Sequence, residues 1–226
     1  AEELIKSNNV VLVEKSAGVA SGFTDKDYIN SGATIINTPE EIYSKSDMIV
    51  KVKEPIKHEL ELIKEDQIIF TFFHFAASEE LTNEMIENQS ISIAYETVQK
   101  NNGELPLLVP MSEVAGRMAV QNGAKCLEAN MGGKGKLLSG VPGVEPATVT
   151  ILGGGVVGTN AAKLAAGLGA KVNILDINSE RLRYLNDIMP PNVYTLHSNN
   201  HNILELLPKT DLLIGAVLIV GAKAPN

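Results

Sequence analysis

Two side chains in the first half of the chain, Lys53 and His74, stand where chemistry could take place. Lys53 ends an apolar run that begins at Met48, and Pro55 stops strand pairing just after it. His74 follows the apolar run from Ile68 to Phe73. If both runs are parallel strands, both side chains lie at the carboxyl edge of a sheet, where such sheets bind ligands. A lysine there could hold a carboxylate and a histidine could carry a proton. The alternatives are a solvated lysine and a core histidine with satisfied hydrogen bonds.

A glycine-rich turn in the second half predicts a dinucleotide site. Residues 151–176 read ILGGGVVGTNAAKLAAGLGAKVNILD, which is an apolar run, a G-x-G-x-x-G turn, a helical pattern and a second apolar run ending in an acid. Gly153 permits the tight turn, Gly155 lets the backbone approach a pyrophosphate, and Gly158 lets the helix pack closely on the strand. Asp176 can accept hydrogen bonds from both ribose hydroxyls, and it repels a 2′-phosphate, so NAD is favoured over NADP. The alternative is a glycine turn that only connects a strand to a helix.

Composition excludes several classes of function. The chain has 226 residues with a net charge of −8, and it holds no basic cluster that would favour nucleic acid. It shows no apolar run of membrane-spanning length and no signal peptide. The single cysteine, Cys126, fits a reducing cytoplasm and is expected to be an inert, small residue of the core. No group of Cys and His residues has the spacing of metal ligands, so no metal is predicted.

The elements alternate between short apolar runs and amphipathic helices, which predicts an α/β fold with mainly parallel sheets. We predict two doubly wound, Rossmann-like domains, both incomplete at the chain ends. The substrate domain is placed at 1–130, a glycine-rich connector at 131–146 and the NAD-binding domain at 147–226. Strands are expected at 10–13, 34–36, 48–52, 68–73, 91–95, 149–152, 172–176, 193–196 and 212–218. Helices are expected at 1–6, 24–30, 56–63, 78–87 and 110–130, from residues 38, 179 and 202, and after the glycine turn at 153–158; residues 38–41 carry a capping box.

Several segments together resemble bacterial L-alanine dehydrogenases. The most telling are FTFFHFAAS (70–78), LPLLVPMSEVAGRMA (105–119), ATVTILGGGVVG (147–158) and LLIGAVLIVGAKAP (212–225). The related subunit of proton-translocating transhydrogenase shares the fold and the glycine motif, but lacks the strand motif around His74 and the MSEVAGR helix start. The resemblance covers essentially the whole chain.

The resemblance implies a reaction and a set of roles. The reaction is the reversible, NAD-dependent oxidative deamination of L-alanine to pyruvate and ammonium, carried out by a cytoplasmic hexamer. Lys53 would bind the carboxylate and carbonyl of the substrate, His74 would be the acid/base, and Met111 would line the substrate pocket. Contacts with the cofactor are implied for Ser112, the backbone of Val156 and Val157, Asp176, Arg181, Ser198, Val217 and Leu218.

The chain also departs from the family pattern. The family has an N-terminal strand that carries a substrate-binding arginine, and a catalytic aspartate on a later strand of the nucleotide domain. Neither is found in these 226 residues. We therefore expect this polypeptide alone to have little or no turnover. Two alternatives stay open: a non-catalytic NAD(H)-binding subunit like that of transhydrogenase, and an inactive truncated fragment.

Overall fold

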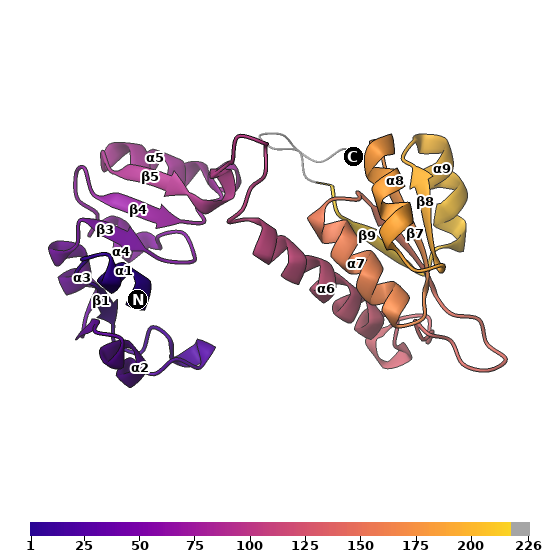
Figure 1. Cartoon of the computed structure of the whole chain (residues 1–226), viewed down its shortest axis with the longest axis horizontal. Helices are drawn as coiled ribbons and strands as arrows, with labels where there is room; N and C mark the ends of the chain where they lie inside the picture. The colour runs from indigo at the N-terminus through magenta and orange to yellow at the C-terminus, as the bar shows by residue number, and fades with distance from the viewer. Residues whose placement is uncertain (218–226) are drawn as a thin grey trace. The chain divides into compact units, whose positions relative to one another are not determined.

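The computed structural model describes residues 1–217 and divides the chain into two compact units, Ala1–Leu105 and Pro106–Asn226 (Figure 1). Each unit is built on parallel strands, and each has its own cluster of buried apolar side chains. The predicted α/β class with two Rossmann-like domains is therefore confirmed.

The first unit holds two small parallel sheets. One pairs β1 with β2, and the other has the order β3-β4-β5. The side chains of Thr24, Thr38 and Ser78 begin three of its helices by accepting a hydrogen bond from a backbone N–H of the first turn. The full capping box forms at Thr24 with Asp27. At residues 38–41, where the sequence predicts such a box, only the bond from the N–H of Glu41 to Oγ1 of Thr38 is present. The elements are α1 (Glu2–Lys6), β1 (Leu12–Glu14), α2 (Asp25–Asn30), β2 (Thr34–Ile36), α3 (Pro39–Lys45), β3 (Met48–Val50), α4 (Lys57–Leu60), β4 (Ile68–Thr71), α5 (Glu79–Glu87) and β5 (Ile91–Ala94).

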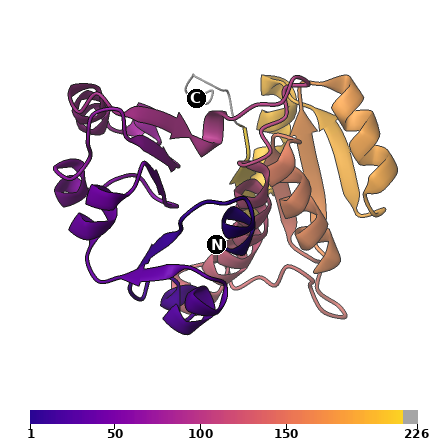
Figure 2. The same cartoon turned by 60° about the vertical axis from the view of Figure 1, so that its left-hand side comes forward.

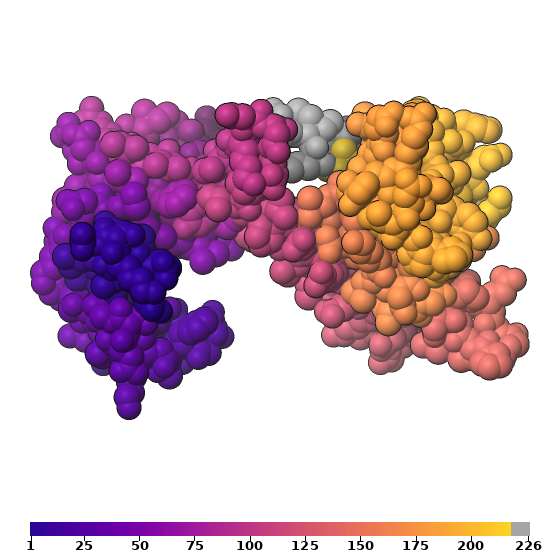
Figure 3. All heavy atoms as spheres, viewed as in Figure 1, coloured from indigo at the N-terminus to yellow at the C-terminus, as the bar shows by residue number. Residues whose placement is uncertain are grey.

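The two faces of the β3-β4-β5 sheet differ. Ile49 and Ile69 point into a core that also contains Tyr43 and Phe73. On the other face, every second residue of the outer strands is an exposed apolar side chain, namely Met48, Val50, Ile91 and Ile93. Helix α1, whose atoms are indigo in Figure 3, lies on the surface of this unit with no buried residue.

The second unit contains a four-stranded parallel sheet in the order β8-β7-β6-β9. The chain moves outward from β6 to β7 to β8 and then crosses back to place β9 on the other side of β6. This reversal makes β6 and β9 the point where doubly wound sheets bind ligands. The elements are α6 (Val109–Cys126), β6 (Thr148–Leu152), α7 (Val156–Gly167), β7 (Lys171–Asp176), α8 (Ser179–Ile188), β8 (Val193–His197), α9 (Asn200–Leu206) and β9 (Leu212–Gly215).

Helix α6 belongs to the second unit, whereas the sequence analysis placed it in the first. It runs beside α7 (Figures 1 and 2). Gly116 makes this approach possible, because a Cβ there would lie 2.2 Å from the carbonyl oxygen of Val157. A Cβ on Gly123 would lie 2.4 Å from the side chain of Leu212 on β9. The glycines thus form the contact face, and Val120 between them is fully buried. Cys126, which the sequence predicts in the core, is exposed at the end of this helix, on a side that does not contact α7 or the sheet.

Several strands are shorter than predicted. β4 ends at Thr71 rather than Phe73, because the backbone turns into a left-handed conformation at His74, with φ of 53°. β3 ends at Val50, although the N–H of Phe72 still donates to the carbonyl oxygen of Val52 at 3.2 Å. β9 spans Leu212–Gly215, and the predicted end of this strand at Leu218 lies outside the described residues.

Candidate functional site

The glycine turn joins β6 to α7 and has the shape that a dinucleotide requires. Gly153 has φ of 103°, and its N–H donates to the carbonyl oxygen of Leu175 at 2.7 Å. A Cβ on Gly158 would lie 1.8 Å from the carbonyl oxygen of Gly153, so only glycine lets the helix begin this close to the strand. At Gly155, by contrast, a Cβ would meet no protein atom within 4 Å. The fold therefore requires glycine at 153 and 158, whereas the space at 155 stays open for a ligand.

The N-terminus of α7 offers hydrogen-bond donors beside this open space. Within residues 1–217, no acceptor is found for the N–H groups of Val156 and Val157. These groups and the partial positive charge of the helix end suit a phosphate. The turn therefore fits the predicted role of Val156 and Val157.

Asp176 at the end of β7 is tied directly to the turn. Its Oδ2 accepts the N–H of Gly154 at 2.7 Å, and its Oδ1 accepts the N–H of Asn178 at 2.8 Å. Its carbonyl oxygen accepts the N–H of Ser198 at 3.0 Å, so Ser198 lies beside it at the same edge of the sheet. The structure thus brings together the acid, the glycine turn and Ser198.

Arg181 lies against the same turn. Its Nε donates to the carbonyl oxygen of Gly154 at 2.6 Å, and its Nη2 donates to Oγ1 of Thr159 at 2.7 Å. Its guanidinium carbon lies 4.9 Å from the ring centroid of Tyr184. Arg181 therefore holds the turn through its side chain, a role that the sequence analysis did not foresee.

The remaining candidates of the second unit lie at two places. Val217 follows β9 next to the turn, because a Cβ on Gly153 would lie 3.0 Å from the nitrogen of Val217. Leu218 lies outside the described residues. Met111 and Ser112 lie in the first turn of α6, with Met111 exposed and Ser112 half-buried, one turn before the contact of Gly116 with α7.

In the first unit, Lys53 and His74 follow neighbouring strands at the same edge of the sheet. Oγ1 of Thr71, at the end of β4, donates to the carbonyl oxygen of Lys53 at 2.8 Å. His74 comes three residues after Thr71, and both Lys53 and His74 are exposed. The structure therefore brings these two residues to one edge of the sheet. The exposure of Lys53 also fits the alternative of a solvated lysine, and His74 lacks the burial that both interpretations of the histidine assumed.

The two lysines of this edge have different surroundings. Lys51 forms an ion pair with Glu59, and Oε2 of Glu59 also accepts the N–H of Ile56 at 2.8 Å, so Lys51 helps to hold the start of α4. In the part of the chain that the structure describes, Lys53 has no ion-pair partner. Of the two, Lys53 is therefore the one whose ammonium is available to a carboxylate.

His74 is held by groups that the sequence analysis missed. Its N–H donates to Oε1 of Glu96, just after β5, at 2.6 Å. Its ring stacks on Phe72, with centroids 6.0 Å apart and planes at 13°. Tyr95 packs edge-on against Phe70 and Phe72 at 4.3 and 4.9 Å, and burial raises the pKa of its hydroxyl. No motif pointed to Glu96, because its partner is a backbone group 22 positions away.

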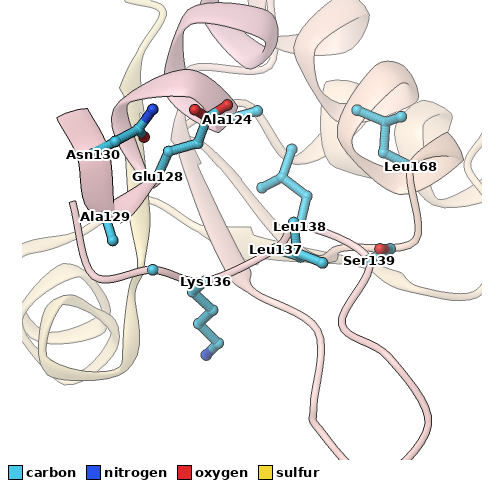
Figure 4. Close-up of a pocket in the computed structure, with 10 residues that line it drawn as sticks. Ala124, Glu128, Ala129, Asn130, Lys136, Leu137, Leu138, Ser139 and Leu168 are labelled. Carbon is cyan, nitrogen blue, oxygen red and sulfur yellow. The ribbon is translucent and has the colours of Figure 1, made fainter.

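An open groove elsewhere in the second unit has a volume of about 530 Å³. Figure 4 shows Leu137, Leu138 and Ser139 of the connector facing Ala124 of α6 and Leu168 after α7. Leu168 follows the C-terminus of α7, at the opposite end of that helix from the glycine turn. The groove is therefore not the predicted cofactor site. Among residues 1–217 we find neither a cluster of three metal-ligating side chains nor a helix long and apolar enough to cross a membrane.

Two family models match the two halves of the chain. Residues 1–115 match the family described as "Alanine dehydrogenase/PNT, N-terminal domain", and residues 119–226 match "Alanine dehydrogenase/PNT, C-terminal domain". An alanine dehydrogenase of Methanococcus maripaludis is 54% identical over 100% of this chain. The chain spans about 60% of the length of the curated relatives it matches.

A solved structure is also similar to this chain over nearly its whole length. A structure titled L-alanine dehydrogenase has a TM-score of 0.91 and 49% identity, and the match covers 99% of this chain and 62% of that one. A transhydrogenase from Sinorhizobium meliloti has a TM-score of 0.79 but only 22% identity, over 99% of this chain and 65% of that one, so it supports the fold alone.

Proposed function

Because the chain belongs to the alanine dehydrogenase/PNT family, we propose that it serves the NAD-dependent, reversible oxidative deamination of L-alanine to pyruvate and ammonium. The observation that carries the proposal is the 54% identity over the whole chain to a protein named alanine dehydrogenase. The strand-end pair Lys53 and His74 and the open glycine turn supply groups that this reaction needs.

The reaction requires a carboxylate anchor and a group that moves protons. L-alanine, NAD⁺ and water give pyruvate, ammonium, NADH and a proton. Bound NAD⁺ would supply the acceptor for the hydride from Cα of alanine. Lys53 binds the substrate carboxylate through its exposed ammonium, for which no ion pair competes among the described residues. His74 accepts a proton from the water that attacks the imine carbon and returns it when ammonia leaves.

The groups assigned to the cofactor lie in the second unit. The open space at Gly155 and the N–H groups of Val156 and Val157 bind the pyrophosphate. Asp176 binds the adenosine ribose, with Arg181 beside it, and this carboxylate disfavours a 2′-phosphate, so NAD is the cofactor. Ser198, Val217 and Leu218 line the adenine and nicotinamide-ribose sides, and Ser112 and Met111 on α6 contact cofactor and substrate. We propose assembly as a hexamer in the cytoplasm, by family resemblance.

One observation favours a second candidate function, an NAD(H)-binding subunit without catalysis. The groups assigned to the cofactor that lie within residues 1–217 are all in the second unit, so binding of NAD(H) does not require Lys53 or His74. The transhydrogenase structure shares this architecture.

The test compares alanine-dependent NADH formation and NADH binding in variants with matched controls. His74→Ala is paired with His58→Ala, and Lys53→Ala with Lys57→Ala, since His58 and Lys57 are exposed on α4. We expect His74→Ala and Lys53→Ala to abolish NADH formation and to remove the effect of pyruvate on NADH binding, while both controls behave as wild type. NADH binding that ignores alanine and pyruvate in the wild-type chain would favour the second candidate.

A further inference from the structure

We infer that Glu96 is a positioning residue that fixes His74 at the end of β4. The inference rests on the proposed function for the role of the imidazole. The contact itself rests on the structure alone.

The backbone of His74 needs an external hydrogen-bond acceptor. At φ of 53° the chain leaves the strand, and the carbonyl oxygen of His74 accepts the N–H of Ala77 in the short turn that follows. Left-handed backbone is uncommon for residues other than glycine and persists only where the surroundings enforce it. The acceptor for the His74 N–H is Oε1 of Glu96, at 2.6 Å.

Glu96 is itself held in place. The preceding residue, Tyr95, packs its ring edge-on against Phe70 and Phe72 of the β4 segment. The second carboxylate oxygen of Glu96 is buried and has no hydrogen-bond partner among the described residues. The carboxylate of this half-buried residue thus has the His74 N–H as its one hydrogen-bond donor among the described residues, and a bond to an ionised acceptor is stronger than a bond between neutral groups.

Two restraints therefore act on His74. Glu96 fixes the backbone, and the stacked ring of Phe72 limits where the imidazole lies. Oγ1 of Thr71, at the end of the same strand, donates to the carbonyl oxygen of Lys53. The proposed carboxylate anchor and the proposed acid/base are therefore both attached to the end of β4. If His74 were displaced, its imidazole would no longer lie at the distance from the Lys53-bound substrate that proton transfer needs. Small displacements of a catalytic group lower the rate by large factors.

The experiment measures hydrogen exchange of the His74 amide in the full chain, in Glu96→Ala and Glu96→Gln. Glu87, exposed at the end of α5, supplies the matched controls Glu87→Ala and Glu87→Gln. We expect exchange to be faster by at least about tenfold in Glu96→Ala, because a charge-assisted bond is lost. Glutamine keeps an acceptor oxygen, so Glu96→Gln should lie between wild type and Glu96→Ala, and both Glu87 variants should match wild type.

Steady-state kinetics give the second readout. We expect Glu96→Ala to lower kcat for alanine oxidation by about tenfold with KM within about twofold, and Glu96→Gln to restore most of kcat. Unchanged exchange at His74 in Glu96→Ala would overturn the inference, and so would faster exchange with an unchanged kcat. If the wild-type chain alone shows little or no turnover, as the sequence predicts, the effect of pyruvate on its NADH binding tests the proposed function, and the exchange comparison decides whether Glu96 holds His74.

Discussion

Single glycines in the turn between β6 and α7 serve two different purposes. Gly158 is required by packing, because a Cβ would overlap the carbonyl oxygen of Gly153 at 1.8 Å. Gly155 has φ of −67° and ψ of −162°, which other residues also adopt, and its Cβ would face open space. Packing within the described residues therefore does not explain why position 155 lacks a side chain, whereas a bound pyrophosphate would.

This difference predicts opposite outcomes for two alanine substitutions. Gly158→Ala should lower the free energy of unfolding by about 3 kcal/mol, as overpacking does in a tight site. Gly155→Ala should leave it unchanged within about 0.5 kcal/mol and should weaken NADH binding by about tenfold, which corresponds to about 1.4 kcal/mol. Urea unfolding and NADH titration of both variants check this. Unaltered NADH affinity in Gly155→Ala would count against a pyrophosphate at this position.

At the scale of elements, Asp211 anchors the connector that precedes β6. Asp211 lies just before β9, and its Oδ2 accepts hydrogen bonds from Nζ of Lys136 at 2.6 Å and from the N–H of Thr148 at 2.9 Å. Nζ of Lys134 lies 3.4 Å from Oδ1 of the same carboxylate. Burial alone would raise the pKa of this carboxyl, but the bonds from Lys136 and Thr148 hold the pKa below its ordinary value of 3.8. One carboxylate thus joins the connector to the first residue of β6.

The lowered pKa of Asp211 predicts how stability depends on pH. A carboxyl whose pKa is lower in the folded state than in the unfolded state makes its full contribution to the stability of the fold at pH values above its ordinary pKa. This contribution is lost as the pH falls through the pKa of the folded state. The difference in unfolding free energy between wild type and Asp211→Asn should be constant above about pH 5. It should shrink as pH falls below 3.8. Denaturant titrations from pH 2 to 7 measure it. A difference that does not change over this range would contradict the assignment.

The elements show what a sequence can and cannot predict. The helices that begin at Thr24, Thr38 and Ser78 were predicted correctly, because a capping side chain is a local signal. The place of α6 was not, since its apolar residues Met111, Val114 and Met118 stay exposed and its contact face is made by glycines. Where two helices touch through glycines, the contact face carries no periodic apolar side chains, so the sequence does not show which face is buried.

The candidate site shows the same division. The glycine turn and Asp176 were predicted from spacing alone, because their geometry follows from one strand-turn-helix-strand unit. The bonds of Glu96 to His74 and of Arg181 to the turn join a side chain to a distant backbone group, 22 and 27 positions away. Any polar residue can make such a bond, so residue type and spacing do not reveal it.

The whole molecule consists of two units with separate cores. The core of the first unit lies around Ile69 and Phe73, and that of the second around Ile151 and Ile174. The described groups assigned to NAD(H) all lie in the second unit. Lys53, assigned to the substrate carboxylate, and His74, assigned to proton transfer, lie in the first unit, whereas Met111 of the proposed substrate pocket lies on α6 in the second. Binding of the cofactor and binding of the substrate should therefore be measurable separately.

This separation predicts that NADH stabilises the second unit selectively. A ligand that binds only the folded form stabilises it by about 2.7 kcal/mol when its concentration is 100 times Kd. Hydrogen exchange followed by mass spectrometry should show slower exchange in peptides from β6 to β9 with NADH, while peptides from β1 to β5 exchange as before. NADPH at the same concentration is the matched control and should protect less, because Asp176 repels its 2′-phosphate. Equal protection of both units, or equal protection by both nucleotides, would contradict the assignment of the cofactor to the turn at 153–158 and its acid.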